Sequence, residues 1–188
     1  MAVCECWLVT PSAPPRLIRH CPGCRETSAF VCAESFRVNA QKKIIDVWLN
    51  YRCARCDEVW KYPVFERVPV SSVGAEQLDA FFRDDPQMVR RHAFDMKRLR
   101  HLRIEASTAV HVRRLPSPSG DSCAPLSIRL DVPLPCAIRL DRLLASELGI
   151  PRAKLHDLYE IGGLVVSPAS KKALSTHVHD GQQLWLLS

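Results

Sequence analysis

The sequence predicts an α+β protein built from three consecutive segments. Residues 1–72 contain short alternating apolar and polar runs typical of β-strands, and two of them, at 35–39 and 43–49, flank a polar turn as in a hairpin. Residues 73–114 place apolar side chains at helical spacing among many basic ones. In residues 115–188, which follow a break rich in Pro and Ser, strand-like runs accompany two helical stripes.

Four cysteines form two C-x2-C pairs, Cys21 with Cys24 and Cys53 with Cys56, separated by 28 residues. Two intervening residues let both sulfurs of a pair point into one tight turn, and a hairpin between the pairs can bring the turns face to face. Four thiolates then occupy tetrahedral corners around one zinc ion and leave no position for water. We therefore expect residues 1–72 to form a zinc ribbon with one structural zinc per chain.

Two other interpretations of these cysteines remain open. Iron can bind the same four sulfurs. Cys21 and Cys24 also have the spacing of a redox dithiol, but residues 26–39 do not have the pattern of the long helix that such a site needs. The remaining cysteines have the apolar surroundings of buried thiols, although Cys4 and Cys6 share one face of a strand and leave a second, weak metal site open.

Composition limits the class of protein. The chain has 188 residues, of which 47% are hydrophobic and 24% charged, and its nine cysteines are an odd number, unlike a secreted disulfide framework. We see no secretory signal and no apolar run of about 18 residues, so we expect a cytoplasmic protein without a membrane segment. We find no catalytic triad, paired carboxylates or phosphate-binding glycine loop, and His177 and His179 lack a third ligand. We therefore expect neither an enzyme nor a small-molecule substrate.

Basic residues are concentrated between positions 90 and 114, within a chain of net charge +6. This stretch contains eight Lys or Arg residues and only two acidic residues, Asp95 and Glu105. Such a block favours polyanion binding, for which we single out Arg90 and Arg91. The alternative is a solvated helix face that balances the acidic stretch at 76–85.

Several motifs resemble one family over nearly the whole chain. They are His20-Cys21-Pro22-Gly23-Cys24, Phe36-Arg37-Val38-Asn39, Asp46-Val47-Trp48-Leu49, Tyr51-Arg52-Cys53-Ala54-Arg55-Cys56 and Arg91-His92-Ala93-Phe94-Asp95. Together they resemble the bacterial proteins grouped as domain-of-unknown-function family 1062. The resemblance implies a small protein with a cysteine-rich first half, and it implies no particular activity.

The last third of the chain carries a second, local resemblance. Its motifs are Arg139-Leu140-Asp141-Arg142-Leu143-Leu144, Pro151-Arg152-Ala153-Lys154-Leu155, Gly162-Gly163-Leu164-Val165-Val166 and His179-Asp180-Gly181-Gln182. This order is similar to the αL RNA-binding module of pseudouridine synthases, tyrosyl-tRNA synthetases and a small-subunit ribosomal protein. The resemblance implies a small αβ module that binds structured RNA. By position, the implied phosphate contacts are Arg139, Arg142, Arg152, Lys154, Lys171 and Lys172.

These observations lead to two functional hypotheses. The first is a non-enzymatic, zinc-containing protein that binds structured RNA through Arg and Lys. The second is a protein-interaction adaptor whose zinc ribbon binds a partner protein through Trp7, Trp48 or Trp60.

Overall fold

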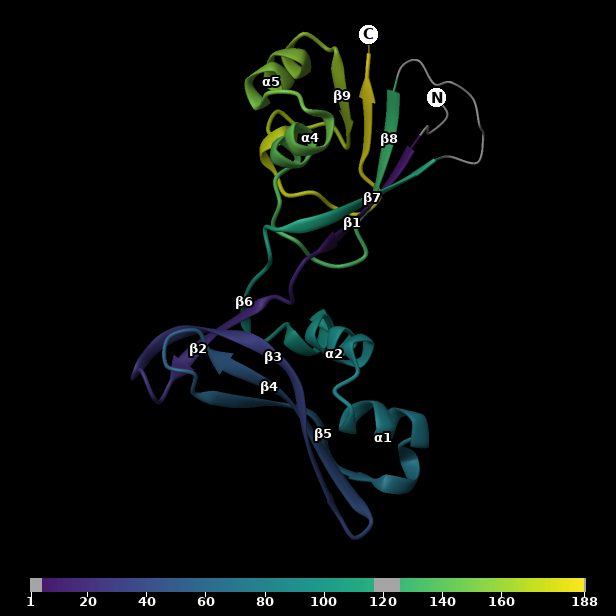
Figure 1. Ribbon diagram of the computed structural model, residues 1–188. Coiled ribbons are helices and arrows are strands. Elements are labelled where there is room, and N and C mark those ends of the chain that lie inside the picture. Colours follow the sequence, from purple (N-terminus) through teal and green to yellow (C-terminus); the bar gives the residue numbers. More distant parts are fainter. Residues whose placement is uncertain (1–4, 117–125, 188) are drawn as a thin grey trace. The chain divides into compact units, whose positions relative to one another are not determined.

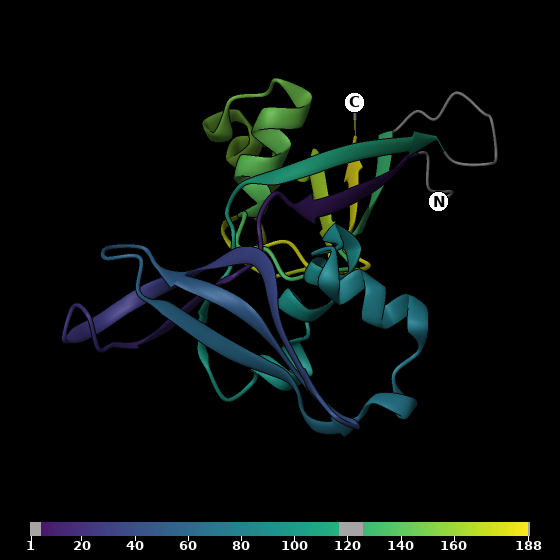
Figure 2. The same ribbon diagram turned by 60° about the horizontal axis from the view of Figure 1, so that its bottom comes forward.

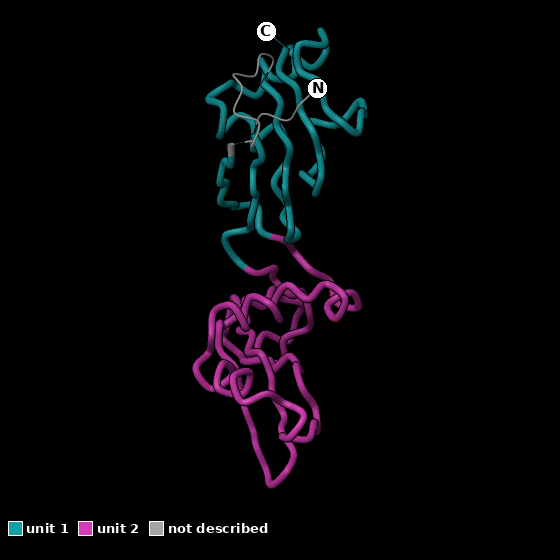
Figure 3. Tube along the Cα trace, turned by 90° about the vertical axis from the view of Figure 1, so that its right-hand side faces the viewer, with its two compact units in different colours: residues 1–13, 107–188 teal, residues 14–106 magenta. Residues whose placement is uncertain are grey.

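The computed structural model describes residues 5–116 and 126–187, which form two compact units (Figure 3). Unit 1 combines the two ends of the chain, Met1–Ala13 and Ser107–Ser188, whereas unit 2 is the continuous segment Pro14–Ala106. Each unit contains a five-stranded sheet and helices of its own, so the α+β prediction is confirmed. The predicted Pro- and Ser-rich break falls largely on residues outside those described.

The sheet of unit 2 is antiparallel and has the strand order β5-β4-β3-β2-β6 (Figure 1). Successive hairpins connect β2 to β5, and the one between β3 and β4 is the predicted hairpin, with Gln41 opposite Ile44 at its tip. The strands are β2 (Arg16–Cys21), β3 (Glu26–Gln41), β4 (Ile44–Cys53), β5 (Val59–Pro69) and β6 (Arg103–Glu105).

One face of this sheet is buried. Along β4, Ile45, Val47, Leu49 and Tyr51 are fully buried, and the residues between them are at least partly exposed. Because successive side chains of a strand point to opposite faces, this alternation separates an inner face from an outer one. The inner face forms the core of unit 2.

Short helices cover the inner face on one side of the sheet (Figures 1 and 2). The Phe81 ring packs edge-on against Phe36 and Phe65. Asp85 begins the second helix: its carboxylate accepts two backbone N–H groups, and Pro86 occupies the first helical position, where no hydrogen bond is lost. The helices are η1 (Val70–Ser72), α1 (Ala75–Phe82), α2 (Pro86–Ala93) and α3 (Met96–Leu99).

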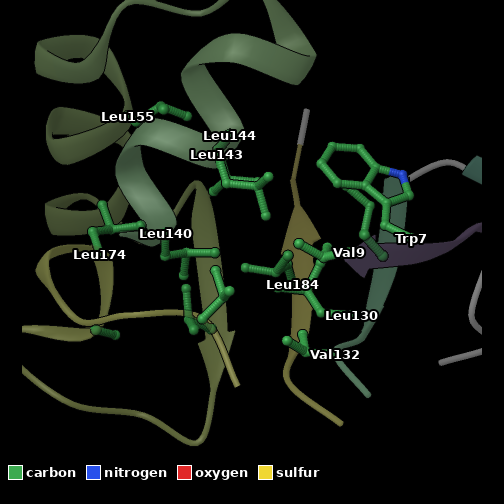
Figure 4. Packing of buried hydrophobic residues seen from close by; sticks show 14 of the residues in the cluster. Trp7, Val9, Leu130, Val132, Leu140, Leu143, Leu144, Leu155, Leu174 and Leu184 are labelled. Atoms are coloured by element: carbon green, nitrogen blue, oxygen red, sulfur yellow. The ribbon is translucent and has the colours of Figure 1, made fainter. Parts of the chain in front are cut away.

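Unit 1 packs its helices on a mixed sheet with the strand order β7-β1-β8-β10-β9. Trp7, Leu130, Leu143 and Leu184 are almost completely buried in the core between them (Figure 4). Gly149 ends the first helix of this unit in the left-handed conformation, with φ 67°. The elements are β1 (Glu5–Pro11), β7 (Val110–Pro116), β8 (Leu126–Asp131), α4 (Leu140–Leu148), α5 (Arg152–Glu160), β9 (Leu164–Ser167), η2 (Ala173–Ser175) and β10 (Gln183–Leu186).

The two units differ in their bounds from the predicted segments 1–72, 73–114 and 115–188. Strand β1 pairs with β7 and β8 of unit 1 and contributes nothing to the sheet that carries the cysteine turns. Its burial explains why, since Trp7 and Val9 are both fully enclosed in the core of unit 1. The segment 73–114 is helical only as far as α3, and β6 and β7 follow.

The basic block is divided accordingly. Arg90 and Arg91 lie in α2 of unit 2, whereas Arg113 and Arg114 lie in β7 of unit 1. The expectation of one continuous helical basic connector is therefore wrong. No helix in the described part of the chain combines the length and the apolar character needed to cross a membrane.

His92 is held in its neutral form by its surroundings. Its ring lies between Phe36 and Phe81, with centroid distances of 6.0 and 5.7 Å, and its Nε2 atom is buried without a hydrogen-bond partner among the described residues. Burial, together with the positive charges of Arg91 and Arg98, lowers the pKa of His92 to about 4.

This shift predicts acid sensitivity. An unfolded histidine has a pKa of about 6.5, so the unfolded chain binds more protons and the stability of the fold falls as the pH decreases from about 6.5 to about 4. Urea denaturation at pH 7.5 and at pH 5 should therefore show a smaller loss of stability for His92→Phe than for the original chain. The exposed His101 supplies the control, because His101→Gln should leave the difference unchanged. Equal losses of stability in all three proteins would mean that His92 does not cause the acid sensitivity.

Candidate metal centre

The four paired cysteines meet at one end of the unit 2 sheet. Their sulfur atoms all lie within 4.8 Å of one another, with 3.5 Å between Cys21 and Cys56 and 3.7 Å between Cys24 and Cys53. Sulfurs placed tetrahedrally about 2.3 Å from a zinc ion are about 3.8 Å apart, whereas sulfurs of a disulfide are about 2.0 Å apart. The four cysteines are free, and their arrangement fits one metal ion.

Strand pairing brings the two turns together. Cys21 ends β2 and Cys53 ends β4, so each pair begins where a strand stops. Phe30 of β3 lies opposite Cys53, and the Ala54 backbone N–H donates to the Ala29 carbonyl at 2.8 Å. The hairpin of β3 and β4 thus holds the second cysteine turn beside β3, the strand that follows the first cysteine turn.

The two turns have the same backbone conformation. Arg25 N–H donates to the Cys21 carbonyl at 2.8 Å, and Asp57 N–H donates to the Cys53 carbonyl at 3.1 Å. Arg25 and Asp57 both adopt left-handed φ values, 58° and 59°. In the first turn the Cys24 N–H also points at the Cys21 sulfur, at 3.4 Å. Two matching turns facing each other give the four-sulfur arrangement expected from the sequence.

Backbone donors favour an anionic sulfur in this site. The backbone N–H of Arg55, helped by that of Cys56, lowers the pKa of Cys53 to about 6, against the opposing effect of burial. A thiolate is the form of cysteine that binds metal. Cys53 can therefore supply one charged ligand at neutral pH, whereas the pKa of Cys24 is raised and that of Cys56 is raised to about 12 beside the other sulfurs.

Other candidate ligands stay apart from this cluster. Within residues 5–116 and 126–187, the four cysteines are the one group of three or more potential ligands close enough to share an ion. Accordingly, His20, which is exposed on β2, is no fifth ligand, and His177 and His179 join no such group. Cys6 likewise belongs to no group of three or more potential ligands among the described residues, and Cys4 lies outside them.

Two of the predicted phosphate contacts bind a carboxylate within the chain. Asp141 is fully buried at the start of α4, and its oxygens accept from Arg139 at 2.8 and 3.1 Å and from Arg152 at 2.6 and 3.0 Å. His156 Nε2 lies 3.5 Å away. Burial alone would raise the pKa of Asp141, but the hydrogen bonds from the two arginines lower it below its usual value.

This network was not anticipated from the sequence. Asp141 compensates the charges of Arg139 and Arg152 and ties the start of α5 to the start of α4. The sequence signal was present in the Arg139-Leu140-Asp141 run, where an acidic side chain falls in the first turn of a helix. That both arginines contact phosphate stays a prediction.

The remaining predicted contacts are more accessible. Arg142, Lys154, Lys171 and Lys172 are exposed, and none of them forms an ion pair with a carboxylate in the described parts of the chain. In unit 2, Arg91 is exposed and the guanidinium of Arg90 lies 5.0 Å from the centre of the Phe94 ring. The structure thus separates the predicted cations into two groups on different units.

Gly23 gives a direct test of the four-sulfur site. A Cβ atom at this position would lie 3.0 Å from the Cys56 sulfur, closer than ordinary contacts allow. We expect Gly23→Ala to weaken metal binding on the order of tenfold, since it displaces one ligand, as measured by competition with a chelator. Gly74→Ala is the matched control because its Cβ would meet nothing within 4 Å. Equal affinities in the two variants would contradict the expected displacement of the Cys56 sulfur.

Comparison with known proteins identifies a family and nothing closer. No curated protein and no solved structure is significantly similar to this chain. A family model described as Protein of unknown function (DUF1062) matches residues 38–170, which is more than two thirds of the 188 residues. The match includes the second cysteine pair but begins after the first, so it is shorter than the resemblance expected over nearly the whole chain. The chain belongs to the DUF1062 family.

Proposed function

We propose that this chain is a non-enzymatic protein that carries one structural zinc ion and binds structured RNA. The observation that carries RNA binding is the group of exposed cations in unit 1, on α4, on α5 and after β9, which no described carboxylate neutralises. The group consists of Arg142, Lys154, Lys171 and Lys172.

The donor set supports zinc as the ion. Four thiolates form the closed shell that is typical of structural zinc sites, and they leave no position at which a substrate could bind. An ion there would hold two turns of the unit 2 sheet together without taking part in a reaction. Iron is the alternative that the same ligands accept.

The position of the cations supports a phosphate ligand. Arg152 and Lys154 lie in the first turn of α5, where the helix dipole adds partial positive charge, whereas Asp157 and Glu160 lie toward its other end. The Asp141 network fixes the first turns of α4 and α5 relative to each other, so Arg142 and Lys154 extend from a rigid base. Contacts of this kind give affinity without reading the base sequence.

A protein partner is the second candidate. Ile161 is 79% exposed after α5, and Val165 and Leu187 are also exposed large apolar residues in unit 1. Exposed apolar side chains mark a protein interface where they form one contiguous patch. An adaptor of this type would bind independently of salt, unlike an RNA-binding protein.

Metal analysis tests the first half of the proposal. We expect the purified protein to contain about one zinc per chain. Cys53→Ser should lose the ion and unfold unit 2, because metal binding and folding are coupled in such sites. Cys6→Ser, which changes a cysteine of unit 1 outside the cluster, should retain it. Iron in the purified protein would contradict zinc, and a full complement of zinc in Cys53→Ser would contradict the ligand set.

RNA binding is tested by its dependence on salt. We expect the full chain to bind bulk transfer RNA, and the double variant Arg142→Gln with Lys154→Gln to lower the slope of log affinity against log salt by about 2, or about 1 for each lost contact. The control is Arg113→Gln with Arg129→Gln, which removes the same charge from exposed strand positions of unit 1. An affinity that ignores salt, or equal slopes in the two variants, would favour the adaptor.

A further inference from the structure

Within unit 2, whose residues are all described, no helix packs on the outer face of β3, β4 and β5. The helices of unit 2 contact the inner face through Phe36, Phe65 and Phe81, and the alternation along β4 places Trp48, Asn50 and Arg52 on the opposite side. All three of those outer residues are at least partly exposed.

Cations border this outer face in adjacent rows. Trp48 lies opposite Arg37 on one side and Pro63 on the other, and the next row pairs Asn50 with Lys61. Arg52 follows, between Val31 and Val59. The cations Arg37, Lys61 and Arg52 are exposed, and none of them pairs with a carboxylate of the described residues.

The face continues into a shallow depression near the tip of the β3–β4 hairpin. Lys42, Lys43 and Arg67 line this depression of about 470 Å³ together with Asp46. The Asp46 carboxylate already accepts the backbone N–H of Arg67 at 2.7 Å. From the depression to Arg52 there are therefore six exposed cations, against the engaged carboxylate of Asp46 and the exposed Glu66 beside Arg67.

Trp48 is available for contact in a way that two other tryptophans of the chain are not. Trp7 is fully buried beneath Arg114, and Trp60 lies under Arg19, whose guanidinium carbon is 4.0 Å from the ring centre. The indole of Trp48, in contrast, makes no hydrogen bond, ring contact or cation contact with the side chain of any other described residue. A partly exposed indole among cations and without an internal partner is suited to stacking on a flat ligand.

We propose that single-stranded nucleic acid binds along this outer face, with a base stacked on Trp48 and phosphates held by Arg37, Lys61 and Arg52. One aromatic ring bordered by cations can stack a base while the cations hold the neighbouring phosphates of a single strand. The ten residues of β4 extend over about 33 Å, long enough for several nucleotides. An acidic peptide would match the charges but would offer no ring to the indole.

This site is separate from the cations of unit 1 that carry the proposed function. The two ligands also differ, since structured RNA is expected at unit 1 and an unpaired strand at unit 2. Each proposal can therefore fail while the other holds.

The test uses the full chain and a fluorescently labelled oligouridylate of about 12 nucleotides. We expect Arg37→Gln with Lys61→Gln to lower the salt slope of binding by about 1.4, at about 0.7 for each phosphate contact on a single strand. The matched control, Arg83→Gln with Lys97→Gln, removes the same charge from exposed positions on the helical side of unit 2 and should not change the slope.

The indole is tested separately. Trp48→Ala should weaken oligouridylate binding by about 5- to 150-fold, the effect of losing one stacked base. Trp48→Phe keeps an aromatic ring, so it should retain most of the affinity and lose the part of the tryptophan fluorescence that the ligand quenches. Trp48→Phe therefore still tests stacking on an aromatic ring if Trp48→Ala disrupts the fold.

Three results would overturn the proposal. One is a salt slope in the Arg37 and Lys61 variant equal to that of the control. Another is full displacement of the oligonucleotide by polyglutamate of equal charge, which would assign the face to acidic peptides. The third is loss of oligouridylate binding in the Arg142 and Lys154 variant alone, which would place all nucleic-acid binding on unit 1.

Discussion

The architecture of unit 2 depends on the meeting of four sulfur atoms that come from two separate turns. The hairpin of β3 and β4 sets the distance between those turns, and their matching backbone hydrogen bonds aim the thiols at a common point. Four thiolates at such short distances repel one another. A cation bound between them compensates this repulsion. The same ion would therefore stabilise the end of the sheet from which the outer face of Trp48 and Arg52 extends.

In unit 1, an ion-pair network holds separate segments together. A single buried carboxylate, Asp141, accepts from Arg139, which precedes α4, and from Arg152 of α5, and so fixes the first turns of α4 and α5. A buried ion pair of this type contributes to geometry more surely than to net stability, because desolvation offsets much of the attraction. Its functional consequence is a division of the cations: Arg139 and Arg152 are engaged within the fold, whereas Arg142 and Lys154 remain open to a polyanion.

Local patterns in the sequence predicted much of this structure. The cysteine spacing identified the four sulfurs that lie together, and alternation or helical spacing located the β3–β4 hairpin and the α4 helix, because such signals come from residues close together in the chain. Long-range pairing was missed. Nothing near β1 in the sequence shows that it lies parallel to β8, more than a hundred residues away. The outer position of Trp48 also depends on register and on which face the helices cover, and neither is visible from composition.

The most direct test of the central claim is X-ray absorption spectroscopy at the metal edge of the purified full chain. We expect a single shell of four sulfur neighbours at about 2.3 Å from zinc, with no nitrogen or oxygen ligand. A shell that contains nitrogen or oxygen in place of sulfur would contradict it, since the ion would then be bound elsewhere or by an open site.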